Sequence, residues 1–182
     1  MIVRQRTFDV EQVEAIFRLS EIRPTDFCSK KSGHTFKSHI GISNAKMADR
    51  GEKVHNGKVV AITSFITNES AFSAAAELLN SDPARAALVC LDAGHNGMRT
   101  TVTYSARSPV IVRYLGGGEV KTMPSFWFCM VMDRNGVEPY GLHMQTFFPL
   151  IDPEAELGAW IEDSNGKGGE KRVFPFPLRR PN

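Results

Sequence analysis

Proton transfer near neutral pH is the chemistry that this sequence offers most directly, because imidazole is the one side chain that titrates there without a special environment. Five histidines are present, namely His34, His39, His55, His95 and His143. His55 and His95 stand beside Asn or Gly in turn-like sequence, which is typical of exposed loops. His34 and His39 instead share the stretch GHTFKSHIG with two hydroxyls and a lysine. This combination indicates anion binding together with movement of a proton.

Metal chemistry is not expected at this stretch, because it lacks the carboxylates and thiolates that would complete a metal site. The three cysteines, Cys28, Cys90 and Cys129, lie far apart and form no CxxC pattern, so neither a zinc site nor a disulfide framework is indicated. The glycines at 116–118 lack the spacing of a phosphate-binding loop and predict a hairpin turn. We therefore expect no metal and no cofactor.

The elements that must position these side chains fit into one domain. The chain has 182 residues, 42% of them hydrophobic, which is enough to bury a core. Its 22 Lys+Arg against 20 Asp+Glu leave a net charge of +2, too small to indicate a nucleic-acid partner by itself. No apolar run approaches the ~20 residues of a membrane span. The N-terminus also lacks the apolar stretch of a secretory signal, so we expect no membrane contact.

Helical spacing in the first half and β-branched runs in the second predict an α+β fold, with N-terminal helices followed by a largely antiparallel β-sheet. Helices are predicted over residues 10–19, 43–50 and 68–79, with Ser43 and Asn68 as caps. Strands are predicted over residues 59–67, 86–91, 100–104, 110–115, 125–133 and 140–148. Residues 151–182 show little periodicity and predict a partly mobile C-terminal extension after a single domain over residues 1–150.

The stretch GHTFKSHIGIS at residues 33–43, followed by Arg50, resembles the opening of the RNase A-like toxin domains at the C-terminal ends of bacterial contact-dependent growth inhibition (CdiA) proteins. Those domains begin with a GHT-x-x-x-H-[VI]-G motif and carry an arginine near the end of the next helix. His39 and Arg50 fall on these positions. The strand at 60–65 and the alanine-rich helix after it resemble the family's S-x-F segment and its following helix. TFFP at 146–149 stands where the family shows T-x-Y-P, so the resemblance covers residues 33–149, with Phe148 in place of tyrosine.

The resemblance implies an RNase A-like fold and metal-independent cleavage of RNA. This reaction needs a base for the 2′-hydroxyl proton, a cation for the phosphorane and a donor for the leaving oxygen. His39 is then the base or the acid. The guanidinium of Arg50 binds two phosphate oxygens at once. Thr146 donates to a non-bridging oxygen or orients His39.

Substrate contacts are expected from Phe148, which can pack or stack, from Lys37 and Lys46, which can steer the phosphates, and from His34, the reserve histidine. Because strand side chains alternate between faces, Thr146 and Phe148 should point the same way. His143 should then point to the opposite face unless a bulge intervenes.

The resemblance further implies an endoribonuclease toxin of interbacterial competition, with RNA, tRNA included, as its substrate and a cognate immunity protein as its partner. Such a toxin is delivered as part of a larger secreted system and acts in the cytoplasm of the target cell. Without the resemblance, His39 would be a hydrogen-bonded structural residue, Arg50 a solvated helix end and Thr146 a strand former. The alternative is therefore an α+β binding module that has lost catalysis, which the missing hydroxyl at Phe148 would favour.

Overall fold

The structure, a computed structural model, describes residues 7–22, 33–51, 53–55, 58–60, 62–93, 100–134, 141–154, 156 and 172–174. Along these ranges the elements are α1 (Val10–Ile22), α2 (Thr35–His39), α3 (Asn44–Arg50), β1 (Lys53–His55), β2 (Lys58–Val60), β3 (Ile62–Phe65), α4 (Asn68–Leu79), α5 (Asp82–Asp92), β4 (Thr100–Gly116), β5 (Glu119–Arg134), β6 (Leu142–Leu150) and β7 (Arg172–Phe174). The longest of these helices has 13 residues, and none in the described ranges is long and apolar enough to cross a membrane.

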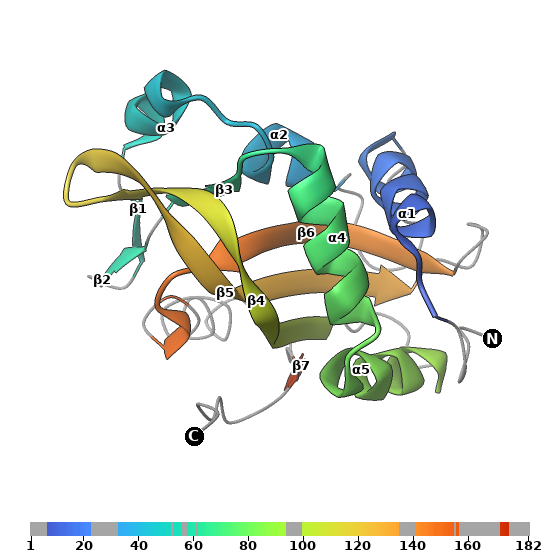
Figure 1. Ribbon diagram of the computed structural model, residues 1–182. Helices are drawn as coiled ribbons and strands as arrows, with labels where there is room; N and C mark the ends of the chain where they lie inside the picture. The colour runs from blue at the N-terminus through green and yellow to red at the C-terminus, as the bar shows by residue number, and fades with distance from the viewer. Residues whose placement is uncertain are drawn as a thin grey trace.

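The central sheet is antiparallel and runs in the order β3-β4-β5-β6, with the short strand β7 added in parallel to the start of β4 (Figure 1). Gly117 and Gly118 form the turn between β4 and β5 with φ values of 64° and 80°, which glycine adopts without strain. The sheet curls until its two edge strands, β3 and β6, meet. There the Thr63 hydroxyl on β3 donates to the Pro149 carbonyl on β6 at 2.6 Å. The predicted α+β fold and the predicted hairpin turn are both confirmed.

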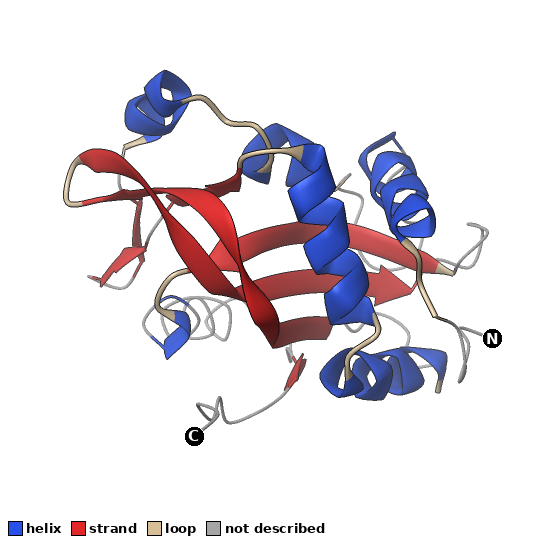
Figure 2. Cartoon of the chain, viewed as in Figure 1, coloured by secondary structure: helices blue, strands red, loops and turns tan. Residues whose placement is uncertain are grey.

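Helices α1, α4 and α5 cover one face of this sheet, which we call the inner face (Figure 2). Phe128 and Phe147 project from the sheet into this layer and meet Phe17 of α1 and Phe72 of α4 in one continuous core. Nearly all of these side chains are apolar, so the inner face is held by the hydrophobic effect and by close packing.

Helix α3 packs separately, against the β4–β5 hairpin. The Ser43 hydroxyl accepts from the Lys46 N–H and caps the helix, as predicted. Met47 is fully buried in a small second cluster with Ile42, Ile62 and Leu115. This packing fixes the direction of the last turn of α3, where Arg50 lies.

The three predicted helices are confirmed as α1, α3 and α4, although the side-chain cap of α4 is Thr67 rather than Asn68. The strand predicted over residues 86–91 is wrong, because these residues belong to helix α5. Ser81 accepts from the Ala84 N–H at the start of α5, and Ala84, Ala87, Leu88 and Leu91 are buried at helical spacing. The strands predicted at 100–104 and 110–115 are two parts of β4, which continues through an irregularity between residues 105 and 110.

A bulge in β6 changes which side chains share the outer face, the face of the sheet opposite the helices. Thr146 pairs with Val131 of β5, whereas His143 pairs with Asp133, only two residues further along β5. Gln145 is therefore an extra residue, as in a β-bulge. The exception that the prediction allowed therefore applies, because the bulge returns His143 to the face of Thr146. His143 and Asp133 are fully buried there.

Candidate active site

The short helix α2 carries both histidines of the motif and is attached to its neighbours at its first turn. The His34 N–H donates to the Gln145 carbonyl at 3.0 Å, and the Thr35 hydroxyl accepts from the Phe147 N–H at 3.0 Å. The Glu21 carboxylate accepts from the Phe36 N–H, although burial raises the pKa of Glu21 overall. These bonds satisfy groups at the start of α2 and at the edge of β6, so the histidines rest on the sheet rather than on a loose loop.

Gly33, which opens the motif, lies where there is no room for a side chain. Its N–H donates to the Ser20 carbonyl at 2.8 Å, and a Cβ on this residue would collide with the carbonyl oxygen of Met144 in β6. The close approach of two backbones explains why glycine precedes His34 in this fold.

His39 ends α2 and lies over the junction between β3 and β6. Its Nδ1 is 3.4 Å from the Thr63 carbonyl oxygen, and its half-buried ring stacks on Phe148 with ring centroids 5.1 Å apart. A carbonyl oxygen can only accept, so in the tautomer that uses this long contact Nδ1 carries the proton and Nε2 is the basic nitrogen. A histidine held in this way can take a proton at Nε2.

His34 places a second imidazole beside the first. The two ring centroids are 5.9 Å apart, and the His34 side chain is exposed and makes no capping hydrogen bond to α2. Two imidazoles at this separation can act as base and acid on the same substrate.

Arg50 reaches from α3 to the end of α2. Its Nη1 donates to the Ser38 carbonyl at 2.9 Å and its Nη2 to the Lys37 carbonyl at 3.1 Å. The positive charge therefore lies beside the C-terminal carbonyls of α2, next in sequence to His39. Two of the five N–H donors of the guanidinium are used here, and the half-buried group has the geometry to bind an anion with the others.

Thr146 and Phe148 share the outer face of β6, as their pairing with Val131 and Cys129 requires. Phe148 is half-buried and is the contact between this strand and His39. Thr146 is 8% exposed, and its hydroxyl has no hydrogen-bond partner among the described residues. The hydroxyl predicted to serve the reaction thus lies on the same face as Phe148, and its oxygen is covered from solvent.

The two predicted steering lysines differ in position. Lys37 is exposed on α2 between the two histidines in sequence, whereas Lys46 is exposed on α3. Within the described ranges, no three His, Cys, Asp or Glu side chains are grouped so that they could hold a metal ion.

Sequence reasoning missed Thr63, whose backbone carbonyl faces His39 and whose hydroxyl ties β3 to β6. A main-chain acceptor has no signature in residue type, so no signal in the sequence would have found this contact. The structure thus brings His34, His39 and Phe148 together, places Arg50 against the helix that carries the histidines, and leaves Lys46 on another helix.

Comparison with protein-family profiles and with curated proteins finds no match to this sequence. One solved structure has a similar fold: a chain in the crystal structure of a CdiA-CT/CdiI complex from Y. kristensenii. The match has a TM-score of 0.51 and 19% sequence identity, and it covers 65% of this chain and 100% of the other. At this identity the likeness concerns the fold, so the chain has the fold of a protein in a CdiA-CT/CdiI complex.

Proposed function

We propose that this chain is an endoribonuclease toxin of interbacterial competition, which cleaves RNA by attack of the 2′-hydroxyl without a metal and is neutralised by an immunity protein. The observation that carries the proposal is the setting of His39. Its Nδ1 faces the Thr63 carbonyl, its ring is stacked on Phe148, and the ring of His34 is 5.9 Å away. This pair supplies a base and an acid from side chains alone.

In the proposed reaction, one imidazole removes the proton of the 2′-hydroxyl, and the 2′-oxygen then attacks phosphorus. The bond from phosphorus to the 5′-oxygen breaks as the other imidazole protonates that oxygen. The products are a 2′,3′-cyclic phosphate and a 5′-hydroxyl. His39 and His34 each fit either role, because a neutral imidazole can accept a proton and an imidazolium can donate one.

Charge on the phosphorane requires a cation close to the histidines. Arg50 is the best candidate, since it is always protonated and is hydrogen-bonded to the two residues that precede His39. The exposed Lys37 adds a second positive charge on the same helix. We assign the Thr146 hydroxyl to a non-bridging oxygen, where its lack of a partner among described residues would be relieved by substrate.

The role as a toxin rests on the fold together with the motif. The similar chain belongs to a complex named for CdiA-CT and CdiI, and the GHTFKSHIG stretch favours the CdiA-CT half of that pair. A toxin of this kind must be kept inactive in the cell that makes it, so we include an immunity protein as the partner.

The test is to incubate the purified protein with total RNA in EDTA and to identify the ends of the fragments. Wild-type protein should give 2′,3′-cyclic phosphates. His39→Asn keeps a donor that can face Thr63 but cannot transfer a proton, so its cleavage rate should fall by about 10²–10⁴-fold while its melting temperature stays near wild type.

Lys121→Ala serves as the matched control, because it removes an exposed positive charge from β5 that the proposed reaction does not use, and it should leave cleavage unchanged. Intact RNA with the folded wild-type protein under all conditions would overturn the proposal and favour the inactive binding module. Full activity in His39→Asn would instead remove His39 from the chemistry.

A further inference from the structure

Helix α2 is too short to be stable by itself, so the geometry of the histidine pair depends on what holds this helix. It has five residues, whereas an isolated helix needs about 12–15 residues to form in water. His34 is its N-cap and His39 is its last residue, so the short helix between them sets how the two rings lie. The contacts that close the start of α2 therefore also position the proposed base and acid.

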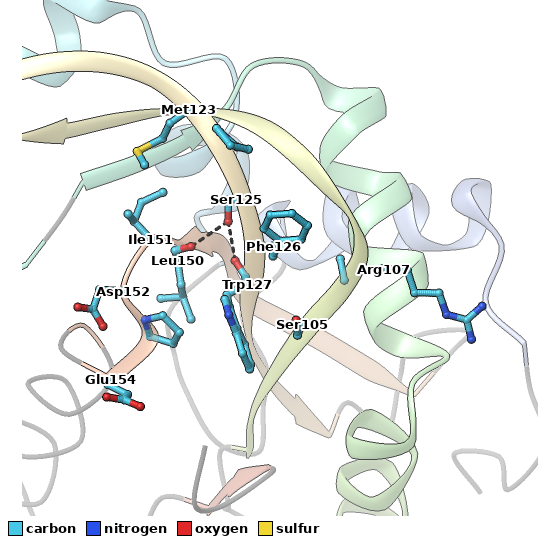
Figure 3. Close-up of a pocket in the computed structure, with 13 residues that line it drawn as sticks. Ser105, Arg107, Met123, Ser125, Phe126, Trp127, Leu150, Ile151, Asp152 and Glu154 are labelled. Carbon is cyan, nitrogen blue, oxygen red and sulfur yellow. Dashed lines mark hydrogen bonds between the residues drawn. The ribbon is translucent and has the colours of Figure 1, made fainter. Parts of the chain in front are cut away.

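These contacts do not come from the groove of about 800 Å³ between β4, β5 and the turn after β6. Trp127 and Glu154 are among the residues that line this groove (Figure 3). No residue of α2 lines it, so the groove is separate from the histidine pair. Helix α2 instead contacts α1, and both helices pack against β6 (Figure 1).

The start of α2 is capped by a side chain from α1. The first backbone N–H groups of a helix have no partner within it, and the N-cap side chain usually accepts from the second or third of them. The His34 side chain makes no such bond. The Glu21 carboxylate of α1 instead accepts from the N–H of Phe36, the second residue of α2. Glu21 thus takes the place of the missing cap.

The electrostatic setting of Glu21 agrees with this role. Burial raises the pKa of the Glu21 carboxyl, while the N–H groups of Phe36 and Lys37 and the positive charge of Lys37 lower it. Each of these lowering contributions comes from α2 and favours the charged carboxylate. The start of α2 therefore stabilises the form of Glu21 that accepts hydrogen bonds most strongly.

Glu21 reaches α2 from a helix that is itself fixed on β6. The hydroxyl of the neighbouring Ser20, which is buried, accepts from the Met144 N–H of β6 at 2.8 Å. On the same helix, the Phe17 ring packs on Phe147 of β6 with ring centroids 5.9 Å apart. The carboxylate is therefore held by a packed element, as a group that orients a reactive site must be.

We propose that Glu21 is a positioning residue for the histidine pair, which caps α2 from α1 and thereby holds His34 and His39 in the relative position that proton transfer requires. The inference rests on the proposed ribonuclease function. It adds a residue outside residues 33–149, the part of the chain whose motifs resemble the CdiA toxin domains. In this role Glu21 acts through α2 and not on the substrate.

The test measures the cap and the reaction separately on the purified protein. Amide hydrogen exchange followed by NMR reports the protection of the Phe36 N–H, and cleavage of a short labelled single-stranded RNA gives kcat and KM. Glu21→Ala should lose this protection, and its kcat should fall by about ten- to hundredfold, because small displacements of reacting groups slow the chemical step. Its KM should stay near the wild-type value, because the proposed phosphate ligand Arg50 lies on α3.

Two conservative variants separate the reach of the acceptor from its charge. Glu21→Gln removes the charge and keeps an oxygen that can accept from the Phe36 N–H, so it should retain most of the protection and most of kcat. Glu21→Asp keeps the charge on a side chain that is one methylene shorter, so it should lose part of both. The comparison of these two variants also decides the question if Glu21→Ala does not fold.

Glu11→Ala is the matched control, because Glu11 is an exposed acidic residue in the first turn of the same helix. It should leave kcat and the amide protection unchanged. Melting temperatures show whether each variant is folded.

Two results would overturn the role of Glu21 while cleavage by the wild-type protein still supports the ribonuclease. One is a folded Glu21→Ala that keeps either the amide protection or the wild-type kcat. The other is a higher kcat in Glu21→Asp than in Glu21→Gln. If the wild-type protein cleaves no RNA, the proposed function fails and the catalytic part of the inference fails with it, whereas the exchange measurement still shows whether Glu21 caps α2.

Discussion

The two faces of the sheet differ in what they bury, although both are built by the same three long strands. On the inner face, residues such as Phe128, Met130 and Phe147 are apolar and covered by helices. On the outer face, Asp133, His143 and Thr146 are buried beside a small apolar cluster. Buried polar groups need hydrogen-bond or ionic partners, which an apolar core does not, so the two faces are held by different kinds of interaction. Phe148, which stacks on His39 of the candidate site, lies on that face.

The neighbouring residues Phe147 and Phe148 show the difference most directly. The centroid of the Phe147 ring lies 5.0 to 6.0 Å from the ring centroids of Phe17, Phe65 and Phe128, all on the inner side. The Phe148 ring instead stacks on His39 and remains half-buried. Phe147 therefore packs in the core, whereas Phe148 faces the candidate active site.

The largest effect expected is on stability, from Phe147→Ala. Removing a fully buried ring from a cluster of aromatic side chains should lower the free energy of unfolding by about 3–5 kcal/mol. Phe148→Ala should cost clearly less in stability, yet it should reduce RNA cleavage, because His39 loses the ring against which it is positioned. Chemical denaturation and a cleavage assay on both variants measure this contrast. Equal losses of stability would mean that the two faces do not differ as described.

Much of the inner face could be predicted from the sequence, because periodicity reports burial on one side of an element. The helix over 68–79 is predicted to the residue. The strand β6 is predicted two residues early, and β5 is predicted without its first six residues. The prediction of a strand in place of helix α5 is wrong because Ala86, Ala87, Leu88 and Val89 form a short apolar run that periodicity alone does not assign. Ser81 followed by Asp-Pro at residues 82–83 is a helix-start signal, and this signal outweighs the apolar run.

The outer face was less predictable, because its contacts depend on register and main-chain atoms. The bulge at Gln145 moves His143 to the face of Thr146, and residue types alone do not reveal such a shift. The proximity of His34 and His39 follows from the motif, but the stacking of His39 on Phe148 requires knowing how α2 lies on β6. The catalytic roles of His39, Arg50 and Thr146 stay predictions. The predicted tail falls mostly outside the described residues, which include only its first residues and β7.

Glu156 provides the next test, because it is a buried carboxyl at the border of the outer face. Its Oε1 accepts from the Ile151 and Asp152 N–H groups, each at 2.7 Å. Burial raises the pKa of Glu156 to about 7, from an ordinary value of 4.5. Burial also raises the pKa of the Cys129 thiol, and the nearby Glu156 carboxylate adds to that effect. The turn after β6 thus brings an acid against the outer cluster.

A raised carboxyl pKa makes the folded state bind the proton more tightly than the unfolded state does. The contribution of Glu156 to stability is therefore full below about pH 4.5, decreases as the pH rises toward 7 and is lost above 7. The difference corresponds to about 3 kcal/mol. Glu156→Gln keeps the acceptor oxygen and removes the charge, so it should be more stable than wild type at pH 8 by up to about 3 kcal/mol and similar at pH 4.5. Denaturation curves at the two pH values measure this.

Glu154→Gln is the control for this measurement, because Glu154 is exposed on the same turn. Its stability should follow the wild-type pH profile. If Glu156→Gln also keeps the wild-type profile, the carboxyl is not held in a poorly solvated setting, and the outer face is more open to water than its burial indicates.

The smallest expected effect comes from Phe148→Tyr, which tests the outer face at the point where this chain departs from the T-x-Y-P pattern. The ring is half-buried and stacks on His39, so a hydroxyl on its edge can reach solvent or a bound phosphate without being buried. We expect the free energy of unfolding to change by less than about 0.5 kcal/mol. A hydrogen bond to a charged group is worth ~1.5–3 kcal/mol, so cleavage should rise by about tenfold, with roughly a hundredfold as the upper limit. If Phe148 is instead a core residue like Phe147, the hydroxyl is buried without a partner and stability falls by ~1–3 kcal/mol with no gain in rate. Measuring melting temperature and cleavage on this one variant separates the two outcomes, and the second would remove both Phe148 and the neighbouring Thr146 hydroxyl from the site.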